Sequence, residues 1–499
     1  MTYELDWLKK WNQYSPNSIA IQDGDSGRTY SYSQFFDAAT RGASYLKSCF
    51  GISQGDRVAV LSLNELEYVV LFYALQRLGA ILVPINYRLT QREVDHIVSD
   101  CRPQLIIYQP EYLQIIEGLN PEIKPPHQLP LQGPDSFQAG FTATQTPFMD
   151  FESQPESATM IIYTSGTTGA PKGAVMSQQM IFWNSINTTL RLNISQHDCS
   201  VIFLPFFHTG GWNVLTTPFF HRGARIIFLK KFDADRVLDL SDKEGATILF
   251  GVPTTMDMLA RSNLFPSVKL DKVRYAIVGG EPMPIELIQT WHQRGIAIRQ
   301  GYGLTEFGPN VFSLNEEDAI RKIGSIGFSN FYIETKVVDD HGQLVGPDQV
   351  GELWLKGPMC MTEYWNNPKA TAETITDGWL HTGDLVRQDM DGYFYVVGRK
   401  KDMFKSGGEN VYPAELEKVI RTLPGVREVA VIGVPDRKWG EVGKAFITLE
   451  PTATLTEQDL IGHCVKNLAK FKVPKFYSFI AELPKGDSGK ILKRKLLDL

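Results

Sequence analysis

Short apolar strand patterns alternate with helical patterns over the first half of the chain, and this alternation restricts the fold more than any other feature. Strand-like runs at 57–61 and 80–84 flank a helical pattern at 65–78. A strand, a helix and a second strand in succession place two parallel strands in one sheet, with the helix as the crossover. The sequence therefore predicts an α/β fold. Further buried strands are expected at 201–204, 225–229, 247–250 and 274–278.

Two segments depart from this alternation. Residues 109–154 are rich in Pro, Gln and Gly, and we expect an irregular connection there. Over 323–398, short strand patterns are separated by turns that contain Asp, Gly and Pro. Such turns between short strands are typical of antiparallel hairpins. The expected hairpin strands are 335–338, 352–355 and 393–396.

The last hundred or so residues have the pattern of a small α+β unit. A helix with Pro413 in its first turn and a helix at 456–469 accompany strands at 429–432 and 445–449. A chain of 499 residues is too long for one hydrophobic core, so we expect at least two domains. Their expected ranges are 1–400 and 401–499.

Composition and charge narrow the class of protein. The net charge of -6 and the pI near 5.9 argue against a protein built to bind nucleic acid. The five cysteines are far apart with no CxxC pair, which predicts free thiols and no zinc site. We find no signal-peptide pattern and no apolar run long enough to span a bilayer. A cytoplasmic protein is expected, with peripheral membrane contact and a homodimer left open.

A Gly/Thr-rich string follows the strand pattern at 159–163. Its glycines, exposed N–H groups, hydroxyls and one lysine can surround a polyphosphate. It is not the P-loop of kinases, because Lys172 stands between Pro171 and Gly173 and the chain continues in extended form. A solvated turn is the alternative interpretation, which the hydroxyls and the lysine after a buried strand disfavour. The candidate phosphate ligands are Thr164, Ser165, Gly166, Thr167, Thr168 and Lys172.

Six motifs in order give the chain a family resemblance that covers nearly its whole length. They are YTSGTTGAPKG (163–173), GGEP (279–282), GYGLTE (301–306), DGWLHTGDL (377–385), GRKKDMFKSGGENVYPAELE (398–417) and GDSGKILKR (486–494). Together they resemble the adenylate-forming superfamily of acyl-CoA synthetases, luciferases and peptide-synthetase adenylation domains. The resemblance implies a large N-terminal adenylation domain of parallel α/β layers with a small β-barrel-like subdomain, and a small mobile α+β C-terminal domain.

The same resemblance implies an ATP-dependent acyl-CoA synthetase. A carboxylic acid and ATP would give an acyl-adenylate and pyrophosphate, and coenzyme A would then take the acyl group and release AMP. The implied co-substrates and cofactor are ATP, coenzyme A and Mg²⁺. Arg437, Lys438, Lys444, Lys472 and Lys475 are candidates, as a group, for the phosphates of coenzyme A.

In the family, Tyr302 would stack on adenine, Thr305 would contact the α-phosphate and Glu306 would help to hold Mg²⁺. Oxygen ligands and one or two carboxylates suit that ion. By position, Asp384 would accept the ribose hydroxyls, and Arg399 would contact the ribose or phosphate end. The remaining implied nucleotide-binding residues are Gly280, Glu281, Pro282, Gln300, Gly301 and Gly303.

Lys490 is implied to be the catalytic residue of the first half-reaction, because a lysine can stabilise the charge that passes to pyrophosphate. His208 is expected to position the carboxylate and to gate the thiol channel. The small domain would rotate about a hinge at Lys401 between the two reactions. A loop would then line the pantetheine tunnel, with residues Ser406, Gly407, Gly408 and Glu409.

The acyl pocket implied by the family is apolar and carries no arginine for a second carboxylate. A fatty acid of medium or long chain is therefore the expected substrate. An aryl-acid CoA ligase, of cinnamate or succinylbenzoate type, is the alternative enzyme. A non-catalytic acyl-adenylate-binding protein and a luciferase-like oxygenase also stay open. The expected pocket residues are His208, Trp212, Asn213, Gly251, Val252 and Gly303.

Overall fold

The computed structural model describes residues 4–145, 151–164, 171–486, 491–497 and 499. The chain forms two compact units. The first comprises Met1–Glu334 and Leu355–Leu380, and the second comprises Thr335–Trp354 and His381–Leu499. No helix within the described ranges has the length and apolar character needed to cross a membrane. The division into functional domains at Lys401 stays a prediction.

A six-stranded sheet forms one part of the first unit, with the strand order β6-β5-β3-β4-β7-β8. β3 pairs in parallel with β4 and β5, as the strand–helix–strand pattern predicts, and α3 (Leu66–Leu78) is the crossover. β7 and β8 instead pair antiparallel. The strands of this sheet are β3 (Arg57–Leu61), β4 (Ile81–Ile85), β5 (Leu105–Tyr108), β6 (His127–Pro130), β7 (Ala158–Thr164) and β8 (Lys172–Ser177).

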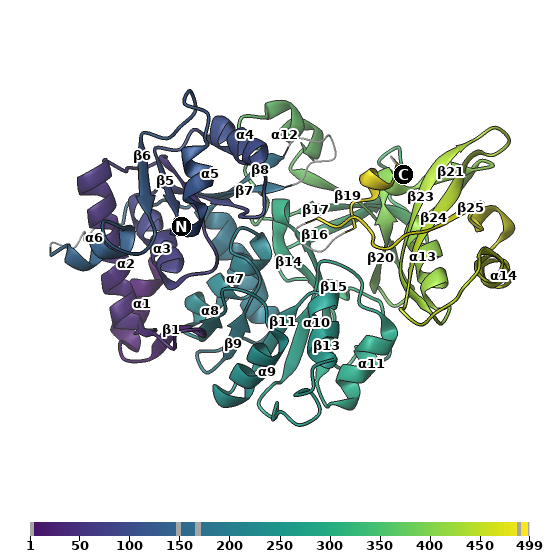
Figure 1. Ribbon diagram of the computed structural model, residues 1–499, viewed down its shortest axis with the longest axis horizontal. Helices are drawn as coiled ribbons and strands as arrows, with labels where there is room; N and C mark the ends of the chain where they lie inside the picture. The colour runs from purple at the N-terminus through teal and green to yellow at the C-terminus, as the bar shows by residue number, and fades with distance from the viewer. Residues whose placement is uncertain (1–3, 146–150, 165–170, 487–490, 498) are drawn as a thin grey trace. The chain divides into compact units, whose positions relative to one another are not determined.

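A second sheet carries the edge that matters for function. β11, β12 and β13 pair in parallel, whereas β14 pairs antiparallel with β13. α10 (Pro253–Ala260) and α11 (Ile285–Gln293) lie beside these strands (Figure 1) and pack Met256 and Trp291 into the core beneath them. The strands are β11 (Ile248–Gly251), β12 (Tyr275–Val278), β13 (Ala297–Leu304), β14 (Gly308–Ser313) and β15 (Phe328–Ser329).

A third sheet and a set of helices complete the first unit. The sheet has the order β2-β1-β10-β9. Its strands are β1 (Ile19–Asp23), β2 (Thr29–Ser31), β9 (Cys199–Ile202) and β10 (Arg225–Phe228). The other helices of this unit are α1 (Trp7–Tyr14), α2 (Tyr32–Phe50), α4 (Gln91–Cys101), α5 (Leu113–Glu117), α6 (Phe137–Ala143), α7 (Gln178–Arg191), α8 (Thr216–Arg222), α9 (Ala234–Lys243) and α12 (Pro368–Thr374).

Two expectations need correction. Residues 109–154 are not simply irregular, because they contain α5, β6 and α6. β6 forms because its backbone pairs in parallel with β5, from Leu105 opposite His127 to Tyr108 opposite Pro130, and such long-range pairing leaves no hydrophobic pattern in a polar segment. The strand expected at 201–204 is β9, which runs earlier, from Cys199 to Ile202.

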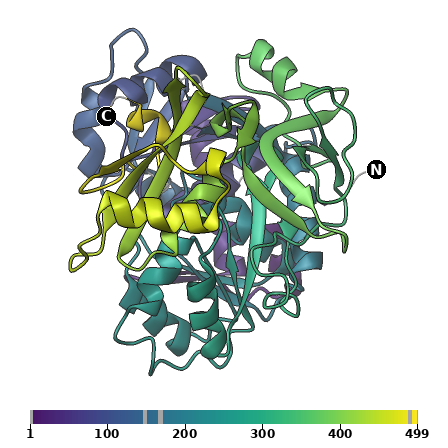
Figure 2. The same ribbon diagram turned by 90° about the vertical axis from the view of Figure 1, so that its right-hand side faces the viewer.

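The second unit contains the small α+β fold. A sheet of order β22-β21-β24-β23, with β25 on β24, packs against α13 and α14 through Leu416, Leu460 and Val431. Figure 2 shows the yellow helix α14 crossing in front of these strands. The elements are β21 (Phe404–Ser406), β22 (Glu409–Val411), β23 (Val426–Asp436), β24 (Gly440–Leu449), β25 (Phe476–Phe479), α13 (Pro413–Arg421) and α14 (Glu457–Asn467).

One further sheet has the order β16-β17-β19-β18, with β20 on β19. β19 pairs antiparallel with both β18 and β20, so the strand expected at 393–396 does lie in an antiparallel hairpin. The strands are β16 (Glu334–Val338), β17 (Val350–Lys356), β18 (Ile375–Thr376), β19 (Trp379–Gln388) and β20 (Phe394–Arg399).

Candidate nucleotide-binding and active site

The parallel pairing of β11, β12 and β13 ends at one edge of the second sheet. Gly251 at the end of β11 lies opposite Val278 of β12, and Val278 lies opposite Gln300 of β13. Ligands of open α/β sheets bind in the crevice outside the carboxyl ends of such strands. The register therefore brings the GGEP loop and the GYGLTE segment, predicted to hold the nucleotide, to one edge.

Glycines leave that edge bare of side chains. A Cβ added at Gly279 would lie 3.5 Å from the carbonyl oxygen of Gly301, so the two predicted motifs lie close to each other. Gly280 has φ +87°, which favours glycine, and a Cβ there would lie 3.5 Å from Cγ1 of Val252. Backbone is thus exposed where a flat base could approach. Glu281 and Pro282, the next residues of the loop, are exposed.

Gln300 supplies a polar group at this edge. The residue is 4% exposed, and its Oε1 accepts no hydrogen bond within the described residues. A buried acceptor without a partner costs about 1–3 kcal/mol. The exocyclic amino group of adenine is a donor of the kind that such an oxygen needs, so the residue fits the predicted ATP site.

The turn after β13 is built around Gly303. A Cβ at this position would lie 2.1 Å from the carbonyl oxygen of Pro309, so only glycine allows this close approach. Tyr302 stands opposite Phe312 on β14, with the ring centroids 5.8 Å apart. The turn places Thr305, which is 8% exposed, in the short 3-10 helix Thr305–Phe307 directly after the strand.

Glu306 follows Thr305, and its carboxylate has one firm partner. Oε1 accepts a 2.9 Å hydrogen bond from the hydroxyl of Tyr364. Burial, with the Glu306 charge adding to it, raises the pKa of the Cys360 thiol to about 12, so this thiol stays protonated. No group of three His, Cys, Asp or Glu side chains among the described residues could hold a metal alone. A single carboxylate still fits Mg²⁺, which completes its shell with substrate phosphates and water.

The described part of the phosphate loop consists of its two ends. Thr164 and Lys172 stand opposite each other where β7 and β8 meet, and Thr164 Oγ1 lies 3.5 Å from the carbonyl oxygen of Lys172. The ammonium of Lys172 lies 5.3 Å from the ring centroid of Tyr364. The predicted ligands Ser165, Gly166, Thr167 and Thr168 lie outside the described residues, as does the predicted catalytic Lys490.

His208 has a defined tautomer. Its Nδ1 accepts a 3.1 Å hydrogen bond from the N–H of Gly210. The proton of the neutral ring is therefore on Nε2, which can donate to a carboxylate. This arrangement agrees with the predicted positioning role and disfavours a general-base role for Nδ1.

Trp212 and Asn213 lie deeper than a pocket lining requires. Trp212 is fully buried, donates a 2.5 Å hydrogen bond to the carbonyl oxygen of Phe206 and stacks on its ring with centroids 4.5 Å apart. Asn213 is 2% exposed and accepts from the hydroxyl of Thr217 at 3.0 Å. Both belong to a π-helical turn, Gly210–Val214. The structure gives them packing roles, and contact with an acid stays a prediction.

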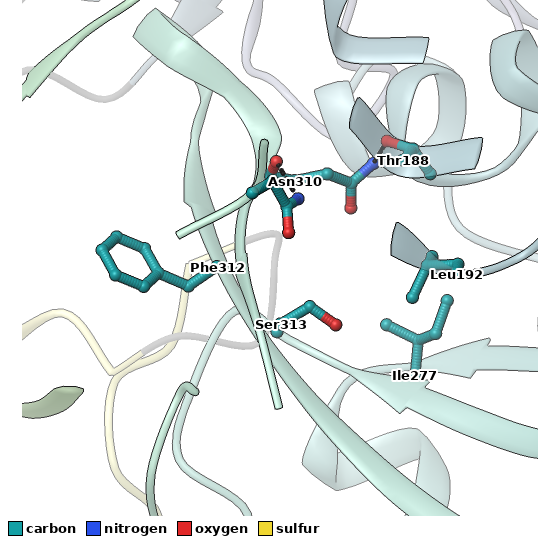
Figure 3. A pocket seen from close by; sticks show the side chains of 8 residues that line it. Thr188, Leu192, Ile277, Asn310, Phe312 and Ser313 are labelled. Carbon is teal, nitrogen blue, oxygen red and sulfur yellow. Dashed lines mark hydrogen bonds between the residues drawn. The ribbon is translucent and has the colours of Figure 1, made fainter. Parts of the chain in front are cut away.

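A crevice beside Gly301 lies between α7 and the strands β12, β13 and β14 (Figure 3). Its wall is polar on the side of Asn310, whose Nδ2 donates to the hydroxyl of Thr188 at 2.6 Å and to the carbonyl oxygen of Asn213 at 3.0 Å. Asn310 thus ties β14 to the π-helical turn. The residues that line the crevice are Thr188, Leu192, Ile277, Gly301, Asn310, Phe312, Ser313 and Asn330.

The predicted ribose ligand lies in the second unit. Asp384 is 5% exposed, and its Oδ1 lies 2.6 Å from Nε of Arg399. The backbone N–H of Asp384 donates to the hydroxyl of Thr382 at 3.0 Å. Two residues predicted separately from sequence are therefore an ion pair.

The predicted tunnel loop is the turn of a hairpin between β21 and β22. Ser406 stands opposite Glu409, and the two residues between them, Gly407 and Gly408, have φ of +60° and +90°. The N–H of Gly407 donates to the carbonyl oxygen of Trp439 at 2.8 Å, whereas a Cβ at Gly408 would meet nothing within 4 Å. The open side of the turn at Gly408 suits a thin ligand.

Other predicted residues of this unit have surface positions. Lys401, the predicted hinge, is exposed in a 3-10 turn, Lys400–Asp402. Of the lysines grouped for coenzyme A, Lys472 pairs with Glu415 at 2.7 Å and Lys475 with Asp436 at 2.5 Å. Binding of coenzyme A phosphates by these two would compete with those carboxylates.

Sequence reasoning missed Tyr364, which contacts both Glu306 and Lys172. The signal was an aromatic pair followed by two asparagines and Pro368, a string that indicates a rigid turn before a helix. A sheet end bare of side chains, beside a lysine and a carboxylate that share one tyrosine, is suited to a nucleoside triphosphate and its metal ion. The fold and site define an adenylate-forming α/β enzyme.

Known proteins bear this out. The sequence matches the family model "AMP-binding enzyme" over residues 8–365 and "AMP-binding enzyme C-terminal domain" over 415–490. A feruloyl-CoA synthase from Amycolatopsis sp is 35% identical over 98% of this chain and 97% of its own. The long-chain-fatty-acid–CoA ligase FadD13 of Mycobacterium tuberculosis is 36% identical over 99% and 97%. The crystal structure of ATP-bound MatB from Rhodopseudomonas palustris aligns with TM-score 0.93 and 30% identity over 99% of each chain.

The chain therefore belongs to the AMP-binding enzyme family, and within it to the ATP-dependent, AMP-forming CoA ligases. The predicted superfamily and fold class are confirmed. The names of the two relatives refer to unlike acyl groups, one aromatic and one a long-chain fatty acyl group. The acid must therefore be argued from the site.

Proposed function

We propose that this ligase converts an apolar monocarboxylic acid, a fatty acid of medium or long chain, into its coenzyme A thioester. The observation that carries the proposal is a set of apolar side chains beside His208. A Cβ at Gly210 would lie 3.3 Å from Nδ1 of His208, 3.3 Å from Cδ2 of Leu204 and 3.9 Å from Cζ of Phe250. Glycine at position 210 lets these side chains approach one another closely, because a Cβ there would crowd His208 and Leu204.

The apolar surface continues toward the nucleotide edge. Phe250 and Val252 flank Gly251 at the end of β11, and Val252 is the side chain nearest to Gly280. Beside His208, the side chains nearest to Gly210 are Leu204 and Phe250, and both are apolar. Such a wall favours an uncharged tail over a second carboxylate.

The reaction that we assign to the site has two steps. A carboxylate oxygen attacks the α-phosphorus of ATP, and the bond from that phosphorus to the leaving pyrophosphate breaks. The thiolate of coenzyme A then attacks the acyl carbon, AMP leaves with the bridging oxygen, and the thiol proton goes to solvent. Both steps gain from holding the reactants in line and from fixed donors at the developing charge.

We assign a role in these two steps to each of the following site residues. Nε2–H of His208 orients the carboxylate, Lys172 and Thr305 contact the phosphates, and Gln300 receives the base. Mg²⁺, when bound at Glu306, would neutralise phosphate charge. Lys490 is assigned to the first step and the Gly408 turn to the second, with rotation about Lys401 between them. These roles and a cytoplasmic location remain predictions, and a homodimer stays open.

An aryl acid is the second candidate, favoured by a different observation. Tyr68, Phe72, Phe206 and Trp212 are each at most 1% exposed and pack ring against ring, with centroids 4.5–5.7 Å apart. This aromatic cluster packs around the π-helical turn that carries Trp212, and aromatic surroundings favour a flat aromatic tail. The similarity to a feruloyl-CoA synthase supports the same candidate.

A competition assay decides between the two. Purified protein would receive MgATP, coenzyme A and pairs of acids, one saturated fatty acid and one cinnamic or arylacetic acid, and both thioesters would be quantified. Preference for fatty acids that rises with chain length supports the proposal. Turnover of aryl acids alone would replace it by the second candidate. Adenylate formation without any thioester would favour the acyl-adenylate-binding alternative, and light emission with oxygen uptake would favour an oxygenase.

A further inference from the structure

Tyr364 lies in a short segment that is clamped between two parts of the first unit. On one side, Ala174 of β8 forms an antiparallel bridge with Tyr364, and the N–H of Trp365 donates to the carbonyl oxygen of Gly173 at 2.7 Å. On the other side, the N–H of Met361 donates to the carbonyl oxygen of Glu306 at 2.8 Å. The backbone of this segment therefore spans from the end of the phosphate loop to the turn after β13.

The side chain of Tyr364 repeats the same connection. It is 7% exposed, its hydroxyl donates to Oε1 of Glu306 at 2.9 Å, and its ring centroid lies 5.3 Å from Nζ of Lys172. A bond to one carboxylate oxygen fixes the orientation of the group while the other oxygen keeps its lone pairs for a ligand. An ammonium within about 6 Å of a ring is attracted to its negative face.

The two contacts strengthen each other. A phenol that donates to a carboxylate gains electron density on its oxygen and ring, because linked polar interactions polarise one another. A more negative ring holds the ammonium more firmly. Glu306 and Lys172 come from distant parts of the chain, so without such a link each would have to find its position independently when the substrate binds.

We propose that Tyr364 is a positioning residue that holds the carboxylate of Glu306 and the ammonium of Lys172 at a fixed separation, ready for a metal–triphosphate complex. The hydroxyl serves the metal side and the ring serves the phosphate side. The inference rests on the proposed function, in which those two residues bind MgATP. Tyr364 lies outside the six family motifs, so the family resemblance assigns it no role.

The test separates the two functions of the tyrosine. Binding of ATP is measured by titration calorimetry on the full chain, with Mg²⁺ and with a chelator, for wild type, Tyr364→Phe and Tyr364→Leu. Tyr364→Phe keeps the ring and loses only its polarisation by Glu306, so we expect metal-free ATP to bind within about twofold of wild type while the advantage of MgATP falls about tenfold. Tyr364→Leu should also weaken metal-free ATP binding, by about threefold.

Tyr395→Phe is the matched control, because its hydroxyl also contacts a carboxylate, Asp389, at 3.3 Å, in the β19–β20 sheet of the second unit. It should bind both forms of ATP as wild type does. Thermal unfolding checks the fold of each variant. If Tyr364→Leu does not fold, Tyr364→Met takes its place.

Two results would overturn the inference. One is that Tyr364→Phe prefers MgATP over metal-free ATP as strongly as wild type does. The other is that this variant loses the same affinity for metal-free ATP as for MgATP, which would indicate general damage to the site. The proposed function fails in a different way. In that case wild-type protein would exchange no pyrophosphate with any acid, whatever its affinity for ATP.

Discussion

Oδ1 of Asp384 lies 2.6 Å from Nε of Arg399, across the antiparallel pair of β19 and β20. The carboxylate is nearly buried, whereas the arginine side chain is 47% exposed. A buried carboxylate that already has a cationic partner is fixed in direction. In the proposed function, this carboxylate is the acceptor for the ribose hydroxyls.

Replacing Asp384 by Asn should weaken nucleotide binding. The amide removes the charge that makes hydrogen bonds to hydroxyls strong, so we expect KM for ATP to rise by about tenfold or more. Initial-rate measurements of AMP formation check this. Asp348→Asn is the control, because Asp348 pairs with Arg387 at 2.8 Å in an exposed position, where such pairs contribute little. An unchanged KM in Asp384→Asn would contradict the assigned role.

Gly303→Ala should damage the turn that carries Thr305 and Glu306. The added Cβ would lie 2.1 Å from the carbonyl oxygen of Pro309, and backbone must shift to relieve that contact. We expect a loss of about 1–3 kcal/mol in the free energy of unfolding, with a fall in kcat. Denaturant unfolding and steady-state rates measure both. Gly398→Ala, where a Cβ meets nothing within 4 Å, should be neutral in both assays.

Stability should fall as the pH is lowered, because of His221. Burial, with Arg222 adding to it, lowers the pKa of His221 to about 3 from its usual 6.5. Between these values the unfolded chain binds a proton that the native chain does not. This histidine therefore contributes a slope of about 1.4 kcal/mol per pH unit, with stability complete above pH 6.5 and lost as pH falls.

His221→Asn removes that titration while an amide can still pair with the hydroxyl of Ser185, which lies 2.8 Å from Nδ1 of His221. The difference in unfolding free energy between wild type and variant should therefore shrink as pH falls from about 6.5 to 5. Chemical denaturation at several pH values measures this. Parallel pH profiles for the two proteins would show that His221 does not titrate as described.

Gly408→Leu should separate the two half-reactions. Its φ of +90° and the open space beside it mean that a large side chain would strain the turn and occupy the expected path of pantetheine. We expect acid-dependent pyrophosphate exchange to be kept, and coenzyme A-dependent release of AMP to fall by about a hundredfold. Loss of exchange to the same extent would contradict the assignment of this turn to the second step.

The sequence determined the architecture where local pattern and topology agree. The helix Leu66–Leu78 lies between two apolar runs, and strands so connected must be parallel, as β3 and β4 are. The family of the chain was likewise readable, because ordered motifs are local strings. β6 was not predicted, since its polar residues are strand only through pairing with β5.

The tertiary structure alone decided how the site residues meet. The contacts of Tyr364 with Glu306 and Lys172, and the approach of Pro309 to Gly303, depend on which segments the folded chain places side by side. No local pattern records such distances, because they result from sheet register and turn geometry summed over many residues. Ordered motifs were enough to indicate the family, whereas only the folded chain decided that Tyr364 contacts both Glu306 and Lys172, because those contacts join segments distant in sequence.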